Sequence, residues 1–83
     1  KELRLKIYPN PASEILYIEL NTEKQFKVSL YDILGQKLNL FTQKQFNKLI
    51  LNVSGLKKGI YLLKVEGKDF SQTRKIVIDN NSQ

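Results

Sequence analysis

Acidic side chains are the residues in this sequence best suited to chemistry. Two Asp or Glu side chains held about 5 to 10 Å apart are enough to hydrolyse a glycosidic bond. The candidates are Glu14, Glu19, Glu23, Asp32, Glu66, Asp69 and Asp79. Most of them fall in expected turns or on the expected solvent side of strands, where carboxylates bond backbone amides or are hydrated. We therefore expect no catalytic carboxylate pair.

Other catalytic and ligand-binding groups are missing from the sequence. Its 83 residues include neither Cys nor His, which excludes a thiolate nucleophile, an imidazole base and Cys- or His-based zinc sites. The sequence also has no calcium-binding loop motif and no glycine-rich phosphate loop. We therefore predict that the chain is not an enzyme and that it binds no metal ion or cofactor.

Basic residues outnumber acidic ones by 14 to 8, giving a net charge of +6. The excess lies in residues 42–83, where Lys44, Lys48, Lys57, Lys58, Lys64, Lys68, Arg74 and Lys75 stand against three acidic residues. Such a surface favours an acidic partner, but lysines on a β protein also keep it soluble and protect sheet edges. Aromatic residues alternate with basic ones in 27–31 and 44–48, yet a small β core needs aromatic residues anyway, and we expect no nucleic-acid partner.

These side chains must be positioned by strands, because short apolar alternations bounded by turn residues recur about every ten residues. This spacing predicts an all-β sandwich or barrel. We expect seven strands, at 3–8, 14–20, 26–32, 36–41, 48–53, 60–66 and 70–78. The chain is one domain, residues 1–83, with its core over about 3–78 and a polar tail at 79–83.

The connections carry predictions of their own. The two prolines of residues 8–11 each remove a backbone donor, so this segment should cross between sheets rather than pair. Asp32 and Gly35 predict a hairpin in which Asp32 bonds nearby amides and Gly35 adopts a positive φ. Residues 54–59 are long enough to pass between sheets. The strand at 60–66 begins with apolar residues on both faces, which indicates a central or covered strand.

The chain begins at Lys1 and contains no Met, so we expect it to be a piece of a longer protein. No apolar run approaches the roughly 20 residues needed to span a bilayer, and the start lacks a secretory h-region. We therefore predict no transmembrane segment and expect any export signal to lie upstream.

Four segments, taken in order and spacing, resemble a known family. They are 7–13 (IYPNPAS), 28–38 (VSLYDILGQKL), 51–65 (LNVSGLKKGIYLLKV) and 74–78 (RKIVI). Together they are similar to the type A C-terminal sorting domain of the type IX secretion system of Bacteroidetes, also called the Por secretion system. The resemblance covers about residues 7–78. Residues 79–83 depart from it, because family members often end on a basic residue just after the last apolar strand.

The resemblance implies an immunoglobulin-like antiparallel β-sandwich of about seven strands. It implies a secretion signal that directs an upstream cargo domain in the same chain across the outer membrane. Its partners would be the type IX outer-membrane translocon and a sortase-like cysteine protease that removes the domain. The protein would be in the periplasm in transit and then at the cell surface or outside the cell.

Recognition residues are expected near the last two strands. Gly59 would allow a sharp turn into the sixth strand, and Tyr61 would pack inward with its hydroxyl bonded to backbone, as in a tyrosine corner, so that both serve mainly to maintain the fold. The residues expected to contact a receptor directly are Lys57, Lys58, Arg74, Lys75, Ile76, Val77 and Ile78. The final strand could pair with a receptor edge.

Two other functions remain open at this point. One is an immunoglobulin-like accessory module that binds carbohydrate or a surface protein for an attached enzyme. The absence of Trp and the placement of most Tyr residues within strands weigh against a flat aromatic sugar-binding face. The other is an inert spacer, which would need no particular surface.

Overall fold

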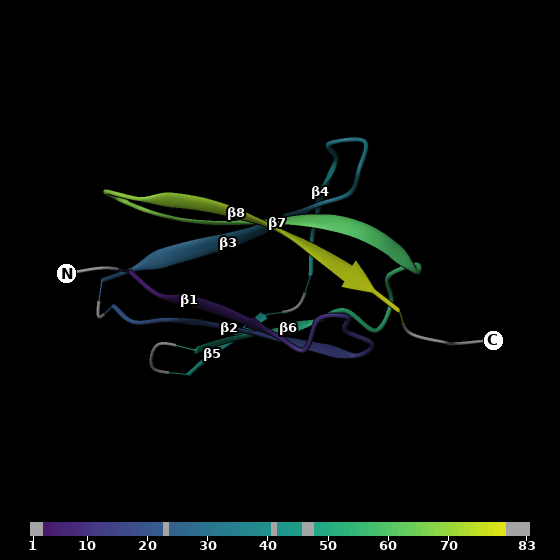
Figure 1. Ribbon diagram of the computed structural model, residues 1–83, viewed down its shortest axis with the longest axis horizontal. Coiled ribbons are helices and arrows are strands. Elements are labelled where there is room, and N and C mark those ends of the chain that lie inside the picture. Colours follow the sequence, from purple (N-terminus) through teal and green to yellow (C-terminus); the bar gives the residue numbers. More distant parts are fainter. Residues whose placement is uncertain (1–2, 23, 41, 46–47, 80–83) are drawn as a thin grey trace.

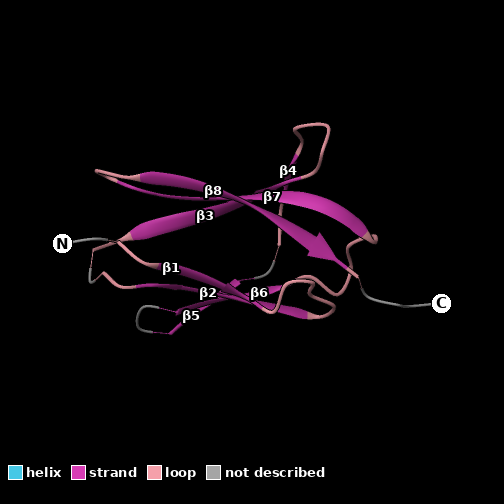
Figure 2. Cartoon of the chain, viewed as in Figure 1, coloured by secondary structure: helices cyan, strands magenta, loops and turns pink. Residues whose placement is uncertain are grey.

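The computed structural model describes residues 3–22, 24–40, 42–45 and 48–79. Within these ranges the chain folds into eight β-strands and no helix, arranged in two layers (Figures 1 and 2). The described chain accordingly contains no helix of the length and apolar character needed to cross a membrane. The predicted all-β sandwich is confirmed.

Each layer is a four-stranded antiparallel sheet. Sheet A has the strand order β1-β2-β6-β5, and sheet B has the order β4-β3-β7-β8. The strands are β1 Leu5–Tyr8, β2 Ile15–Leu20, β3 Phe26–Tyr31, β4 Lys37–Leu38, β5 Thr42–Gln45, β6 Lys48–Asn52, β7 Gly59–Gly67 and β8 Ser71–Ile78.

The core lies between the two sheets and is built by the alternation of side chains along each strand. Sheet A supplies Leu16, Ile18 and Leu20 of β2, all buried. Sheet B supplies Leu63 and Val65 of β7, among others, from the opposite layer. Burying each such side chain stabilises the fold by about 1.5 to 3 kcal/mol, so the period-two apolar pattern fixes which face of each strand turns inward.

The strand count differs from the expected seven in one region. The expected strand at 36–41 is reduced to β4, and β5 forms within residues 42–47, between two of the expected strands. Residues 46–47 lie outside the described residues. All four residues of β5 are exposed, and the strand is held by its backbone pairing with β6. It therefore carries no apolar alternation from which it could be predicted.

The prediction for the proline segment is wrong. Strands β1 and β2 on either side of it belong to the same sheet, so the segment does not cross between sheets. The residue that follows it, Ala12, forms a parallel bridge with Ile78 of β8 in the other sheet. The Ala12 N–H donates to the Val77 carbonyl at 2.9 Å, and the Asp79 N–H donates to the Ala12 carbonyl at 2.8 Å. The loop thus reaches over to the edge of sheet B and returns.

The other predicted connections are confirmed. Oδ1 of Asp32 accepts hydrogen bonds from the N–H groups of Leu34 and Gln36, both at 2.9 Å, and Gly35 has a φ of +86°. Residues 54–59 carry the chain from sheet A to sheet B, and β7 lies in the middle of sheet B between β3 and β8.

Candidate functional site

The two segments expected to carry recognition lie side by side at one end of sheet B. Gly59 is opposite Ile78, Ile60 is opposite Val77, and Tyr61 is opposite Ile76. This is the end at which β7 begins and β8 finishes, on the right in Figure 1. Folding therefore brings together residues that are 15 to 19 positions apart in the sequence.

The strand alternation divides these residues between the core and the surface. Tyr61, Ile76 and Ile78 are buried, with Tyr61 only 8% exposed. Their side chains pack in the core and are not available to a partner. Lys75 is exposed and Val77 partly so, on the outer face of sheet B.

Arg74 takes a third position. It is exposed and lines a small cavity of about 210 Å³ between β8 and β1, whose other lining residues are Leu5, Ile7, Asn10, Lys75 and Ile76. In the pairing with β7, Arg74 lies opposite the buried Leu63, whereas Lys75 lies opposite the exposed Leu62. The two side chains therefore start from opposite faces of β8, although both residues line this cavity.

Tyr61 ties the connection 54–59 to the sheet. Its hydroxyl donates to the Lys57 carbonyl at 2.6 Å, as expected for a tyrosine corner. Gly59 has a φ of +156°, and no heavy atom lies within 4 Å of the position that a Cβ would take there, so backbone conformation and not space favours glycine. Both residues hold Lys57 and Lys58 in place at the end of the sheet.

Lys57 and Lys58 are both exposed. The Lys58 ammonium lies 3.7 Å from the Asp79 carboxylate, with the two side chains 70% and 42% exposed. An ion pair this exposed contributes little to stability. Lys57 and Lys75 are also exposed and add positive charge to this region.

The free edge of β8 is already occupied over residues 75–79. The Val77 N–H donates to Oδ1 of Asn10 at 3.0 Å, and Nδ2 of Asn10 donates to the Lys75 carbonyl at 3.4 Å. Ala12 completes the cover through its two backbone bonds. A receptor strand could pair here only by displacing residues 10–12, so contact through side chains is the simpler mode. The motif of residues 7–13 marked this segment in the sequence, but it did not predict that residues 10–12 would lie against the edge of β8.

The most exposed apolar side chains of this region are not among the recognition residues expected from the sequence. Ile60 is 47% exposed and Leu62 is 41% exposed, both on the outer face of the central strand β7. Val77 lies opposite Ile60, and Tyr31 of β3 lies opposite Leu62. We call Tyr31, Ile60, Leu62 and Val77 the sheet B patch. In the sequence, this patch was indicated by the apolar residues on both faces of the expected strand at 60–66.

Lysines surround the sheet B patch. Lys75 is opposite Leu62 on β8, and Lys37 is opposite Tyr31 on β4. Lys57 and Lys58 lie just before β7. The result is an exposed apolar surface with a positive rim, an arrangement that suits binding to a protein surface better than catalysis.

Comparison with known proteins identifies the family. The family described as "Secretion system C-terminal sorting domain" matches residues 6–79, nearly the whole chain. The chain belongs to this family. The resemblance found in the sequence is confirmed, and the sorting domain is a C-terminal secretion signal of the type IX system and not a catalytic domain.

A curated relative shows the same relationship. The chain is 32% identical over 77 residues to an endo-acting ulvan lyase of Formosa agariphila. The match covers 89% of this chain and 14% of the lyase, so the chain spans a small part of that protein's length. The sorting domain is the tail of a secreted protein, found outside the cell or at its surface.

Proposed function

We propose that the sorting domain is recognised by the type IX outer-membrane translocon through the sheet B patch and the lysines around it. The domain would carry an upstream cargo through the periplasm and across the outer membrane. A sortase-like protease would then remove it at the cell surface. The observation that carries the proposal is the exposed apolar surface on β7, at the end of the sheet where Lys57, Lys58 and Lys75 also lie.

Exposed isoleucine and leucine side chains on a central strand call for an explanation. Contiguous apolar surface on a small folded domain commonly marks a binding site, because covering it with a partner removes it from water. Aromatic and aliphatic anchors at the centre of such a surface carry most of the binding energy. Ile60 and Leu62 are the natural anchors here.

The position of the sheet B patch suits a label attached to a cargo. The described chain starts at one end of the longest axis, which measures 43 Å, and β8 finishes at the other (Figure 1). Cargo that precedes the domain would therefore attach at the end opposite to Lys57 and Lys58. A receptor could engage that far end while the cargo remains folded or unfolded behind it.

Charge supports an acidic receptor. A net charge of +6 speeds the approach to a negatively charged surface, and Lys57, Lys58, Lys75 and Lys37 place part of this charge next to the sheet B patch. Because surface charges are screened by salt, this contribution is expected to weaken as ionic strength rises.

The test is export of a reporter in a Bacteroidetes host. The reporter follows a signal peptide and precedes residues 1–83, and secretion is compared between the wild type and a translocon-deficient strain. We expect Ile60→Thr combined with Leu62→Thr to lower translocon-dependent secretion by about tenfold, because the loss of two central anchors weakens binding by at least that factor.

Ile15→Thr is the matched control. Ile15 also lies on a central strand, faces outward and is 39% exposed, but it belongs to sheet A. We expect it to leave secretion unchanged. Equal secretion by the sheet A and sheet B variants would contradict the proposed recognition surface. Retention of the domain on the reporter in a sortase-deficient strain, and its loss in the wild type, checks the removal step.

A further inference from the structure

A second surface of the sorting domain lies on the side of the sandwich, at the edge of β3. In sheet B the neighbour of β3 on this side is β4, which contains two residues and pairs with Leu30 and Tyr31. Residues 26–29 pair with β7 on their other side. Among the described residues no strand covers this first half of β3 on its outer edge.

The backbone groups at this edge point outward in a known order. The Asp32 N–H donates to the Gln36 carbonyl at 3.0 Å, so the backbone of Asp32 faces the β4 side. Backbone groups of successive residues in an antiparallel strand face its two neighbours in turn. The N–H and C=O groups of Phe26 and Val28 therefore face the same side as those of Asp32, where β4 does not reach them.

The corresponding edge of β8 is arranged differently. There, residues 10–12 bond the outward-facing groups of Lys75 and Val77. Natural sheets commonly protect their edges in this way, because an open row of donors and acceptors pairs readily with another chain. At Phe26 and Val28 the structure shows no such cover from the described residues, so this part of the β3 edge is more available than residues 75–79 of β8. The pockets and lysines beside it distinguish it from the outer edge of Ser71 and Thr73.

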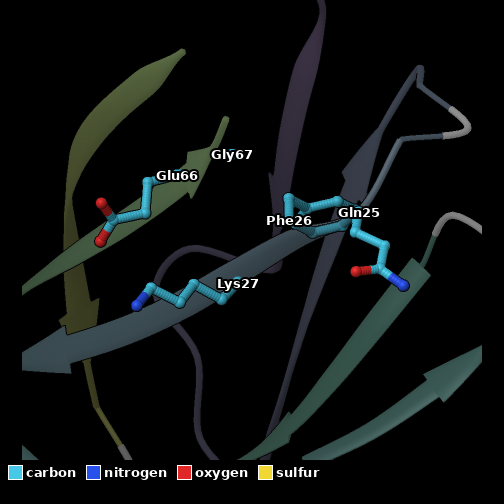
Figure 3. A pocket seen from close by; sticks show the side chains of 5 residues that line it. All are labelled: Gln25, Phe26, Lys27, Glu66 and Gly67. Atoms are coloured by element: carbon cyan, nitrogen blue, oxygen red, sulfur yellow. The ribbon is translucent and has the colours of Figure 1, made fainter. Parts of the chain in front are cut away.

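Pockets lie on both sides of the open segment. One of about 420 Å³ is lined by Gln25, Phe26, Lys27, Glu66 and Gly67, and Figure 3 shows the Lys27 and Glu66 side chains projecting to the same side of their neighbouring strands. The other, of about 230 Å³, has Val28, Leu30, Leu38, Leu40 and Leu51 as its apolar lining. The first pocket lies over β3 and β7, and the second offers an added strand room for apolar side chains next to Val28 and Leu40.

Charge around the open segment selects for an acidic occupant. Lys27 lines the first pocket, and Lys37 lines the second. The Lys44 ammonium lies 5.5 Å from the centre of the Phe26 ring, so a third positive charge stands at the start of β3. Glu66 is the one acidic residue in either lining, and its carboxylate lies 3.9 Å from the Lys64 ammonium.

We propose that the edge of β3 at residues 26–29 binds an extended, acidic segment of a partner protein by β-strand addition. The partner's backbone pairs with Phe26 and Val28. Its apolar side chains enter the pocket lined by Val28 and Leu40, and its carboxylates lie near Lys27, Lys37 and Lys44. This surface is separate from the sheet B patch, so either can be lost without the other.

The test uses the 83-residue chain and a blocked peptide of about eight residues in which Val alternates with Glu and Thr, a length that matches a typical strand. Amide hydrogen exchange is followed by NMR. We expect saturating peptide to slow exchange of the Phe26 and Val28 amides by about tenfold or more, because both become hydrogen bonded. The amides of Ser71 and Thr73 on β8 should not change.

Two kinds of variant sharpen the test. Val28→Pro removes an outward-facing N–H donor of β3 and should lower the affinity for the peptide by about tenfold. Thr73→Pro removes an N–H donor that faces outward from β8 and should leave this affinity unchanged. Lys27→Glu with Lys44→Glu keeps the backbone unchanged and should weaken binding by a similar factor at low salt. A peptide with Lys in place of Glu should also bind more weakly.

Several results would overturn the proposal. One is protection of the amides of β5, or of Ser71 and Thr73, in place of those of Phe26 and Val28. Another is equal peptide binding by the wild-type chain and by the variant that carries both Lys27→Glu and Lys44→Glu. The third is no peptide binding at millimolar concentration. Concentration-dependent protection of the same amides without peptide would show that a second copy of the chain, and not an acidic partner, occupies the edge.

Discussion

The outer faces of the two sheets differ in how far their side chains interact with one another. On sheet A, the rings of Tyr8 and Tyr17 stack with centroids 5.3 Å apart, and the Tyr8 hydroxyl donates to the Glu19 carboxylate. The Lys48 ammonium lies 3.6 Å from that carboxylate and 5.3 Å from the centre of the Tyr17 ring. We call Tyr8, Tyr17, Glu19 and Lys48 the sheet A cluster.

On sheet B the corresponding surface holds exposed Ile60 and Leu62. Further along the same face of β7, Lys64 and Glu66 form an ion pair, but Ile60 and Leu62 are left to solvent or to a partner. This difference supports the proposal that the outer face of sheet B, and not that of sheet A, serves recognition. A surface whose polar and aromatic groups are already engaged gains little by binding, whereas an apolar surface gains in proportion to the area covered.

The largest expected effect separates the inner and outer sides of sheet B. Ile76→Ala should lower the free energy of unfolding by about 2 to 5 kcal/mol, because it leaves a cavity in a fully buried site. Ile60→Ala, on the outer face, should change it by less than about 0.5 kcal/mol. Chemical denaturation measures both. A large destabilisation by Ile60→Ala would mean that the sheet B patch maintains the fold and is not free to serve recognition.

An intermediate effect is expected where the loop from sheet A covers sheet B. Asn10→Ala removes the side-chain bonds to Val77 and Lys75 and should lower the free energy of unfolding by about 1 to 2 kcal/mol. Exchange of the Val77 amide should become faster, while that of Leu63 should follow global unfolding. Ser13→Ala, three positions along the same loop and exposed, is the control expected to be neutral. Unchanged Val77 exchange in Asn10→Ala would show that Ala12 alone protects the edge.

The strands of both sheets could be predicted where burial alternates along them. Leu16, Ile18 and Leu20 show this alternation plainly, and so do Tyr61, Leu63 and Val65. Strand β5 could not be predicted, because its exposed side chains carry no burial pattern and its formation depends on pairing with β6. Local pattern is informative only where packing acts on the side chains.

The candidate site was predictable in part for a related reason. The proximity of residues 57–61 and 74–78 follows from a hairpin, which is local in sequence. The bonds between Asn10 and β8 join residues more than sixty positions apart, and no local pattern encodes that register. The sequence also grouped Arg74 with Lys75, whereas the strand register places Arg74 opposite the buried Leu63 and Lys75 opposite the exposed Leu62. Long-range contacts and side-chain direction therefore required the structure.

The smallest effect tests the sheet A cluster through pH. The hydrogen bond from Tyr8 lowers the pKa of Glu19 below its ordinary value of 4.5, with Lys48 acting in the same direction. The same hydrogen bond, with Glu19 as acceptor, raises the pKa of Tyr8 above its ordinary value of 10.0. The ionised Glu19 and the protonated Tyr8 are thus both favoured by folding.

The direction in which pH changes the stability follows from the linkage between protonation and folding. The contribution of Glu19 is fully present above pH 4.5 and is lost as pH falls through its lowered folded-state pKa. That of Tyr8 is fully present below pH 10.0 and is lost as pH rises through its raised pKa.

Tyr8→Phe should therefore flatten the change in denaturation midpoint on both the acid and the alkaline side, and Glu19→Gln should do the same. Tyr31→Phe, on sheet B, should leave the profile unchanged. Because the cluster is exposed to solvent, the effect should be small and should shrink in high salt. If export were to fall with Tyr8→Phe while the fold persisted, sheet A would also take part in recognition, and the contrast between the two faces would fail.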